Sequence, residues 1–154
     1  MISYLFYLQF YQHLLDALQD LKHGYSMEFL RASSYAGTST TGDVKLLGKE
    51  LVKKEFENRH VILIEDIVDT GTTINNLLPL LESLGPKSVH VCTLLEKRLG
   101  NGHKPAAKAK YSGFSIPDKF IIGYGLDYNE LYRDLKDIWV ISQAGIDFDS
   151  KALL

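Results

Sequence analysis

Disulfides, strong net charge and membrane-spanning runs are all missing from this sequence. Its single cysteine, Cys92, excludes a disulfide within the chain and favours a reducing compartment. The net charge of −2 provides no strong field to attract nucleic acid or a membrane surface, so neither is an expected partner. The apolar stretch 1–11 is too short to cross a bilayer and lacks the positive region and cleavage site of a signal peptide. These absences predict a cytoplasmic protein.

Strand-like and helix-like patterns alternate along the 154 residues. This alternation predicts a single α/β domain over 1–154, with a mostly parallel sheet flanked by helices. Expected helices are 10–21, ended by Gly24, then a helix after residue 73 that contains Pro79 and stops at 85–86, and a turn plus helix at 126–135. Expected strands are 27–33, 61–65, 88–95, 119–125 and 138–142, of which 61–65 is expected to be buried on both faces. A mobile loop is expected at 33–44 and another loop at 97–111. Residues 53–60 are expected to be a polar segment that leads into the strand at 61–65.

The segment VILIEDIVDTGTT, Val61–Thr73, joins an aliphatic strand to three acids and a turn rich in threonine. In open α/β sheets, ligands bind beyond the carboxyl ends of the strands, where this segment is expected to lie. The turn also precedes a helix, whose unpaired N–H groups can hold a phosphate. It is not a Walker A loop, because the lysine of that motif is missing. The acids are Glu65, Asp66 and Asp69, and the turn is Thr70, Gly71, Thr72 and Thr73.

Two adjacent carboxylates at Glu65 and Asp66 repel each other unless a partner neutralises or hydrogen-bonds them. A bound diol or a Mg²⁺ ion held through substrate oxygens would serve. The simpler alternative is that Asp66 or Asp69 caps the following helix. That alternative suits one acid taken alone, whereas the whole pattern favours a binding site.

The segment resembles the 5-phosphoribosyl-1-pyrophosphate (PRPP) binding motif of the type I phosphoribosyltransferases. Further along, LLEKR, FSIPDKFIIGYGLDYNELYRDL and VIS resemble the hypoxanthine-guanine members of that family. The resemblance implies the type I phosphoribosyltransferase fold and transfer of a phosphoribosyl group from PRPP to hypoxanthine or guanine, with Mg²⁺ as cofactor. It also implies that PRPP and a 6-oxopurine are the small-molecule partners and that the protein forms a dimer or tetramer.

The resemblance further implies a role for particular residues. Asp69 is the general base that takes a proton from the purine, while Ser34 and Tyr35 begin a mobile catalytic loop. Lys97 bonds the purine 6-oxygen and Phe120 stacks on the base. The set that binds PRPP is Glu65, Asp66, Asp69, Thr70, Gly71, Thr72, Thr73 and Arg133. The set that binds purine is Lys97, Lys119, Phe120, Ile121 and Asp127, and the metal ligands are Glu65, Asp66 and Asp127.

Some of these residues have plainer interpretations when the resemblance is set aside. Lys97 is then a solvated charge at a strand end, Phe120 is a core residue, and the lysines of the 97–111 loop are solvated. The sequence also departs from the family, because YLFY at 4–7 stands where a Leu-Lys-Gly pyrophosphate loop is expected. We therefore expect a fold that lacks N-terminal elements. Two functions follow: a purine salvage enzyme, or a non-catalytic relative that binds a nucleotide or a partner.

Overall fold

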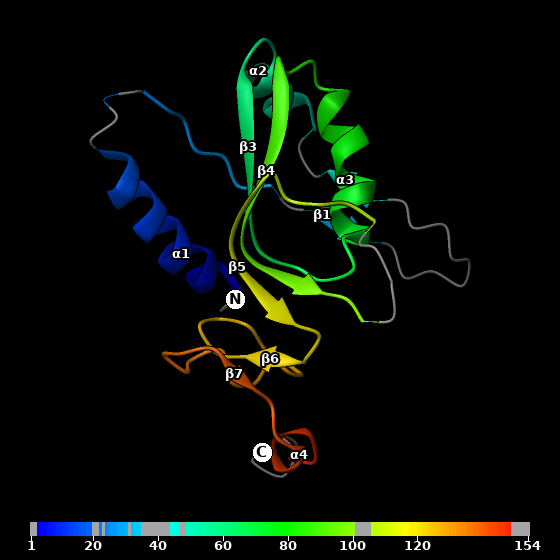
Figure 1. Ribbon diagram of the computed structural model, residues 1–154. Helices are drawn as coiled ribbons and strands as arrows, with labels where there is room; N and C mark the ends of the chain where they lie inside the picture. Colours follow the sequence, from blue (N-terminus) through cyan, green and yellow to red (C-terminus); the bar gives the residue numbers. More distant parts are fainter. Residues whose placement is uncertain are drawn as a thin grey trace. The chain divides into compact units, whose positions relative to one another are not determined.

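The computed structural model describes residues 3–19, 22, 24–30, 32–34, 44–46, 49–100 and 106–148. The chain divides into two compact units, one formed by Met1–Lys22 with Pro117–Leu154 and the other by His23–Ile116 (Figure 1). Each unit is described below on its own. The expectation of a single domain stays a prediction.

The His23–Ile116 unit is built on a three-stranded sheet in the order β3-β4-β5, with β3 at His60–Val68, β4 at Ser88–Arg98 and β5 at Tyr111–Pro117. Strands β3 and β4 pair in parallel from His60 opposite Ser88 to Val68 opposite Glu96. Strand β5 runs the same way, because Lys110 N donates to Val91 O near one end and Arg98 donates to Ser115 O near the other. The parallel sheet is confirmed, although the sequence patterns missed β5.

Two helices of this unit supply one side of its hydrophobic core: α2 at Lys49–Phe56 and α3 at Thr72–Glu82 (Figure 1). The expected apolar face of α3 is confirmed, and Pro79 is accommodated inside the helix. Helix α2 covers part of the segment expected to be a polar approach, so that expectation was wrong; Phe56, only 5% exposed, anchors the helix in the core. The core consists of Phe56, Leu63, Val68, Ile74, Leu77, Leu81, Leu84 and Val91.

The opposite side of β3 is less covered than its aliphatic sequence predicts. Ile62 is 55% exposed, whereas the next residue, Leu63, is buried in the core. Successive side chains of a strand point to opposite faces, so the two residues report on the two sides of the sheet. The expectation that this strand is buried on both faces is wrong at Ile62.

A short antiparallel pair joins β1, Ala32–Ser34, to β2, Val44–Leu46, with Ser34 opposite Val44. The expected strand at 27–33 is therefore wrong over most of its length, since residues 24–30 have no regular structure. The strand pair holds the two ends of the segment predicted to be a mobile loop. Residues 35–43 lie outside the described part of the chain.

The other unit contains α1 at Ser3–Leu18, β6 at Ile121–Ile122, β7 at Trp139–Val140 and α4 at Gln143–Ile146. Strands β6 and β7 pair antiparallel. Helix α1 starts well before the expected position, because no glycine or proline interrupts its sequence, and it ends before Gly24, which is not its cap. Among the described residues, no helix combines the length and apolar character needed to cross a membrane.

The helix expected at 126–135 does not form. Asn129, Glu130 and Tyr132 have φ values of 51°, 66° and 69°, which no right-handed helix contains. The Asp127 carboxylate also accepts the Glu130 N–H at 2.8 Å, in place of a main-chain carbonyl. This segment is instead an irregular loop closed by side-chain contacts.

Candidate functional site

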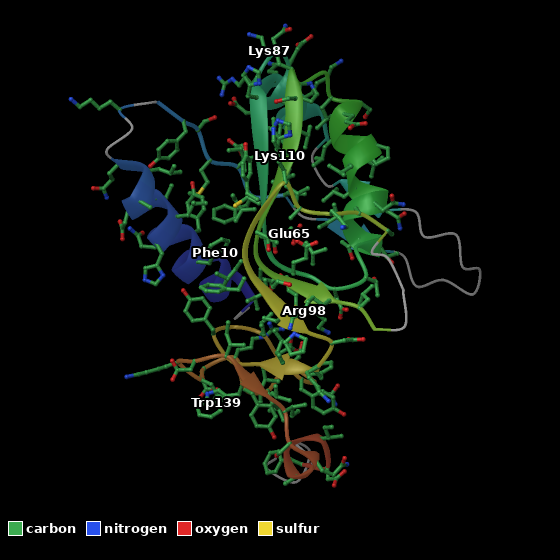
Figure 2. All side chains as sticks on the ribbon, viewed as in Figure 1. Phe10, Glu65, Lys87, Arg98, Lys110 and Trp139 are labelled. Carbon is green, nitrogen blue, oxygen red and sulfur yellow. The ribbon has the colours of Figure 1, made fainter. Side chains whose placement is uncertain are left out.

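Strand β3 carries its acids inside the strand instead of beyond it, because pairing with β4 continues to Val68. Glu65 therefore lies opposite Thr93 of β4, and only Asp69 follows the strand end. Figure 2 shows Lys87 at the end of the sheet where β4 begins, Arg98 at the end where it finishes, and Glu65 between them. The acids thus belong to the half of the sheet that leads to the carboxyl ends of the strands.

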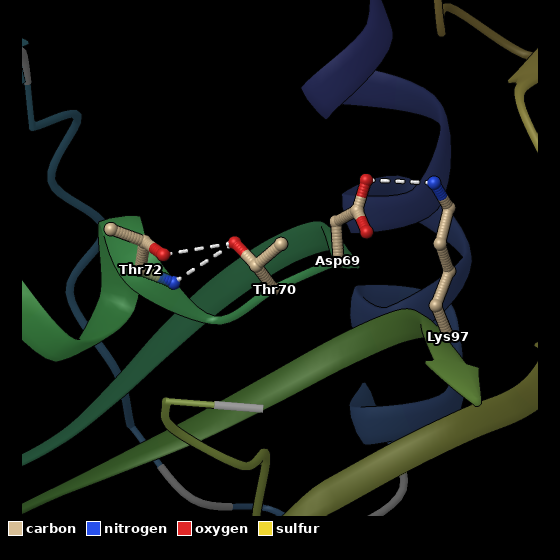
Figure 3. Close-up of polar contacts among 4 residues, drawn as sticks. All are labelled: Asp69, Thr70, Thr72 and Lys97. Carbon is tan, nitrogen blue, oxygen red and sulfur yellow. Dashed lines mark hydrogen bonds and ion pairs between the residues drawn. The ribbon is translucent and has the colours of Figure 1, made fainter. Parts of the chain in front are cut away.

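The turn after β3 leads directly into α3, whose N-cap is Gly71. The N-cap residue itself has no side chain, and neither Asp66 nor Asp69 is the N-cap. Thr70 and Thr72 hydroxyl oxygens lie 2.9 Å apart, and Thr72 N donates weakly to Thr70 Oγ1 at 3.4 Å (Figure 3). The helix therefore presents N–H groups and the positive end of its dipole at a turn with hydroxyl donors. This arrangement suits a phosphate.

Gly71 meets the chain's own backbone at this turn. Its φ is 73°, and a Cβ placed there would lie 2.5 Å from Ala107 O and 2.6 Å from Ala107 N. Next to it, Ala106 N donates to Thr70 O at 2.8 Å. The segment before β5 thus fixes the shape of the turn. The sequence patterns did not predict this contact. The only local signal is that Ala106 and Ala107 are small enough to come close to the turn.

Glu65 and Asp66 differ from ordinary surface acids. Burial raises the pKa of the Glu65 carboxyl to about 7, and the negative charge of Asp66 adds to the rise. Both effects favour the protonated form of the Glu65 carboxyl, which can donate as well as accept a hydrogen bond. Asp66 Oδ1 accepts from Ile67 N at 2.6 Å. Both properties suit recognition of sugar hydroxyls.

The carboxylates fit a Mg²⁺ ion only if a substrate supplies most of its ligands. Over the residues the structure describes, no group of three or more histidine, cysteine, aspartate or glutamate side chains is placed to hold a metal ion. Glu65 and Asp66, being adjacent on a strand, also project to opposite faces. Mg²⁺ in nucleotide sites commonly takes one or two carboxylates plus phosphate oxygens, which is compatible with this set.

Lys97 and Asp69 form an ion pair in which Nζ and Oδ2 are 2.7 Å apart (Figure 3). The register explains their meeting, because the offset of 28 residues that pairs His60 with Ser88 also brings Asp69 beside Lys97. The Lys97 side chain is only 8% exposed, whereas Asp69 is 50% exposed. Lys97 is therefore not the solvated charge of the simpler interpretation. A nearly buried donor and a half-exposed acceptor stand side by side.

The remaining residues predicted to bind purine lie in the other unit. Phe120 is 50% exposed and meets Tyr128 edge to face, with ring centroids 5.4 Å apart. The Tyr128 ring thus orients the Phe120 ring, and about half of the Phe120 side chain stays exposed. Lys119 N donates to Pro117 O at 2.8 Å, and Ile121 begins β6. Phe120 is not the core residue of the simpler interpretation.

Asp127 and Arg133 lie in the irregular loop of the same unit and pair with each other. Arg133 Nη2 is 2.8 Å from Asp127 Oδ1, and Arg133 Nη1 donates to Gly125 O at 2.9 Å. Because Glu130 N occupies Asp127 Oδ2, both carboxylate oxygens have partners. The predicted roles of Asp127 in metal binding and of Arg133 in phosphate binding stay predictions. A ligand at either residue would compete with this pair.

Little of the predicted mobile catalytic loop, which Ser34 and Tyr35 are expected to begin, lies in the described part of the chain. Ser34 is the last residue of β1, and Tyr35 lies outside the described residues. Within the His23–Ile116 unit, the structure brings together the acids of β3, the turn at Thr70–Thr73 and Lys97.

Comparisons with known proteins identify similar sequences over most of the chain. Residues 8–129 match the family model described as phosphoribosyl transferase domain. The hypoxanthine-guanine phosphoribosyltransferases of Mus spretus and Homo sapiens are each 39% identical to it over 145 residues, or 89% of the chain. The chain spans 65% and 64% of the length of these two curated relatives, less than two thirds.

Solved structures show a similar fold. Hypoxanthine phosphoribosyltransferase from Trypanosoma cruzi, in complex with the product IMP, is 37% identical with a TM-score of 0.73, covering 90% of this chain and 71% of that one. Its counterpart from Staphylococcus aureus is 38% identical with a TM-score of 0.69, covering 88% and 72%. The similarity therefore includes both sequence and backbone arrangement.

Proposed function

This chain belongs to the phosphoribosyl transferase domain family, and from that premise we propose that it transfers the 5-phosphoribosyl group of PRPP to hypoxanthine or guanine. The products are IMP or GMP and pyrophosphate. The expected type I phosphoribosyltransferase fold, with a mostly parallel sheet flanked by helices, is confirmed. The relatives' names and the IMP complex of the Trypanosoma cruzi enzyme support the purine substrate.

The sugar phosphate is assigned to the β3–α3 segment. The N–H groups at the start of α3, with the hydroxyls of Thr70, Thr72 and Thr73 and the closely packed backbone at Gly71, would bind the 5-phosphate. Glu65 and Asp66 would hold the ribose hydroxyls, and the raised pKa of Glu65 would let its carboxyl serve as donor or acceptor. This assignment places the phosphate at a helix N-terminus whose N-cap, Gly71, has no side chain.

The purine is assigned to Lys97 and Phe120, with Lys119, Ile121 and Asp127 as further contacts. The Lys97 ammonium would donate to the 6-oxygen, and the exposed surface of the Phe120 ring would stack on the base. Arg133 would contact pyrophosphate, while Ser34 and Tyr35 would begin the loop that excludes water. Each role rests on the match to family motifs and on the side-chain chemistry described above.

The proposed reaction balances around Asp69. Purine N9 forms a bond to C1 of the ribose, and the bond from C1 to the pyrophosphate oxygen breaks, with both electrons leaving on pyrophosphate. The proton on purine N7 passes to the Asp69 carboxylate, a transfer that typically contributes ~10²–10⁴-fold to rate. Glu65 and Asp66 would contact one Mg²⁺ at the ribose hydroxyls and Asp127 would hold a second, and Mg²⁺ would neutralise charge on the leaving group.

The observation that carries the proposal is the position of Asp69 between the N-terminus of α3, whose N-cap is Gly71, and the nearly buried Lys97. The test is formation of IMP from PRPP and hypoxanthine. In Asp69→Asn, kcat should fall about 10²-fold or more, because the amide cannot take the proton. Glu82→Gln, an exposed change at the far end of α3, is the matched control and should leave kcat unchanged.

Two outcomes would count against this function. Full turnover in Asp69→Asn would reject Asp69 as the base. Binding of IMP without any formation of IMP would instead favour the alternative, a non-catalytic nucleotide-binding member of the family.

The cytoplasmic location and a homodimeric or homotetrameric assembly also belong to the proposal. The location is supported by the single cysteine, and the assembly by family resemblance alone. Sedimentation of the purified protein would test the assembly.

A further inference from the structure

The Lys97–Asp69 ion pair presents a hydrogen-bond donor and an acceptor side by side. Nζ and Oδ2 are 2.7 Å apart, and both side chains lie at the carboxyl ends of neighbouring parallel strands. One edge of a 6-oxopurine carries the complementary pattern. Its 6-oxygen accepts a hydrogen bond, and the adjacent ring nitrogen N7 can carry a proton to donate.

The ion pair already engages one N–H of the Lys97 ammonium and Oδ2 of the Asp69 carboxylate. A base edge that approaches these same two atoms therefore competes with an existing charge-assisted hydrogen bond. Lys97 is 8% exposed, so water cannot readily replace Asp69 as its partner. A nearly buried ammonium separated from its carboxylate carries a large desolvation cost unless another acceptor takes over.

We propose that the Lys97–Asp69 pair is a latch that a purine 6-oxygen opens. This inference rests on the proposed function and adds a positioning role for Lys97 beyond reading the base. While the pair is closed, Asp69 Oδ2 is engaged by the ammonium and is not free to take the purine proton. A 6-oxygen accepts the Lys97 hydrogen bond in place of Asp69 and releases the carboxylate to act as base.

The latch differs from a simple contact between Lys97 and the 6-oxygen. A simple contact improves binding of 6-oxopurines and leaves kcat alone, because substrate and transition state gain equally. The latch makes the 6-oxygen affect kcat as well. Bases that lack a 6-oxygen leave Asp69 paired with Lys97. Adenine has an amino group at position 6, which would place a hydrogen-bond donor against the Lys97 ammonium, itself a donor.

Calorimetry on the full chain tests the exchange of partners without requiring turnover. IMP is compared with purine riboside 5′-monophosphate, which lacks the 6-oxygen and the proton on N1. Discrimination is the Kd of purine riboside 5′-monophosphate divided by the Kd of IMP. In Asp69→Ala the pair no longer has to open, so this ratio should be roughly tenfold higher than in the unmodified chain, the scale of a hydrogen bond to a charged group. Lys97→Met should abolish discrimination, with a ratio near one.

Three controls make the binding result decisive. Asp69→Asn keeps an oxygen acceptor for Lys97, so its discrimination should rise less than in Asp69→Ala, and it also serves if the alanine variant unfolds. Unchanged discrimination in both Asp69 variants would overturn the latch, because Lys97 would then serve both partners at once. Failure of either nucleotide to bind would instead reject the proposed function, and the latch with it.

Turnover with hypoxanthine and unsubstituted purine supplies a second measurement. In the unmodified chain, kcat for unsubstituted purine should be lower by roughly tenfold or more, matching the loss of one charge-assisted hydrogen bond. Lys97→Met should raise kcat for unsubstituted purine and bring the two values together. Lys97→Arg keeps a cation that can pair with Asp69 and should preserve the difference. A substrate difference confined to KM in the unmodified chain would overturn the proposal.

Discussion

Substitution of Gly71 would measure how strongly the Thr70–Thr73 turn is held in place. Gly71→Ala places a methyl group 2.5 Å from Ala107 O, where ordinary contacts are 3.4 Å or longer. The left-handed φ of 73° adds about 1–2 kcal/mol for any residue other than glycine. Relief of the clash requires movement of the segment that donates from Ala106 N to Thr70 O, which endangers a hydrogen bond worth about 1 kcal/mol. We expect a total loss of about 2–4 kcal/mol in the free energy of unfolding.

Gly85→Ala is the matched control. Gly85 has a similar φ of 80°, but the nearest atom to an added Cβ is Glu57 Cγ at 3.9 Å. It should therefore lose only the conformational part, about 1 kcal/mol. The assay is denaturant unfolding of both variants, followed by titration with IMP, whose affinity should fall in Gly71→Ala alone. Equal losses of stability in the two variants would refute the close approach of Ala107 to the turn.

Two further predictions concern the core and the pH dependence. Leu81 is completely buried, so Leu81→Ala should lower the free energy of unfolding by about 2–5 kcal/mol, whereas exposed Asn75→Ala in the same helix should change it by less than about 0.5 kcal/mol. The Glu65 carboxyl has a folded-state pKa of about 7 against an ordinary value of 4.5, so the native state binds more protons than the unfolded state and stability is lost as pH rises from 4.5 through 7. Glu65→Gln should remove this loss, roughly 1–3 kcal/mol, and parallel curves of unfolding midpoint against pH for the two proteins would contradict it.

Local sequence patterns were sufficient for the strand–turn–helix that carries the candidate phosphate site. An aliphatic run forms β3, leucines at helical spacing form the buried face of α3, and glycine permits the left-handed turn between them. Each of these depends on interactions between residues close in sequence, so the pattern and the structure agree. The family motifs predicted the residues of the candidate site, and the roles of those residues stay predictions.

Longer-range contacts decided the features that the patterns missed or misjudged. Residues 126–135 have helix-like spacing, yet the Asp127–Arg133 ion pair and three left-handed residues hold them in an irregular loop. Helix α2 is largely polar, and burial of Phe56 in a core built by α3 and the sheet accounts for its place. Periodicity within a short segment contains no information about such partners.

The sequence by itself determined which chemical groups the site contains, and the tertiary structure decided which of them meet. Asp69 and Lys97 are 28 residues apart, and only the parallel register of β3 and β4 places them 2.7 Å apart. Gly71 and Ala107 come together because the chain returns past the turn before β5. Side-chain identity is local, whereas strand register and loop return depend on packing of the whole unit, so the ion pair and the locked turn are visible only in the folded chain.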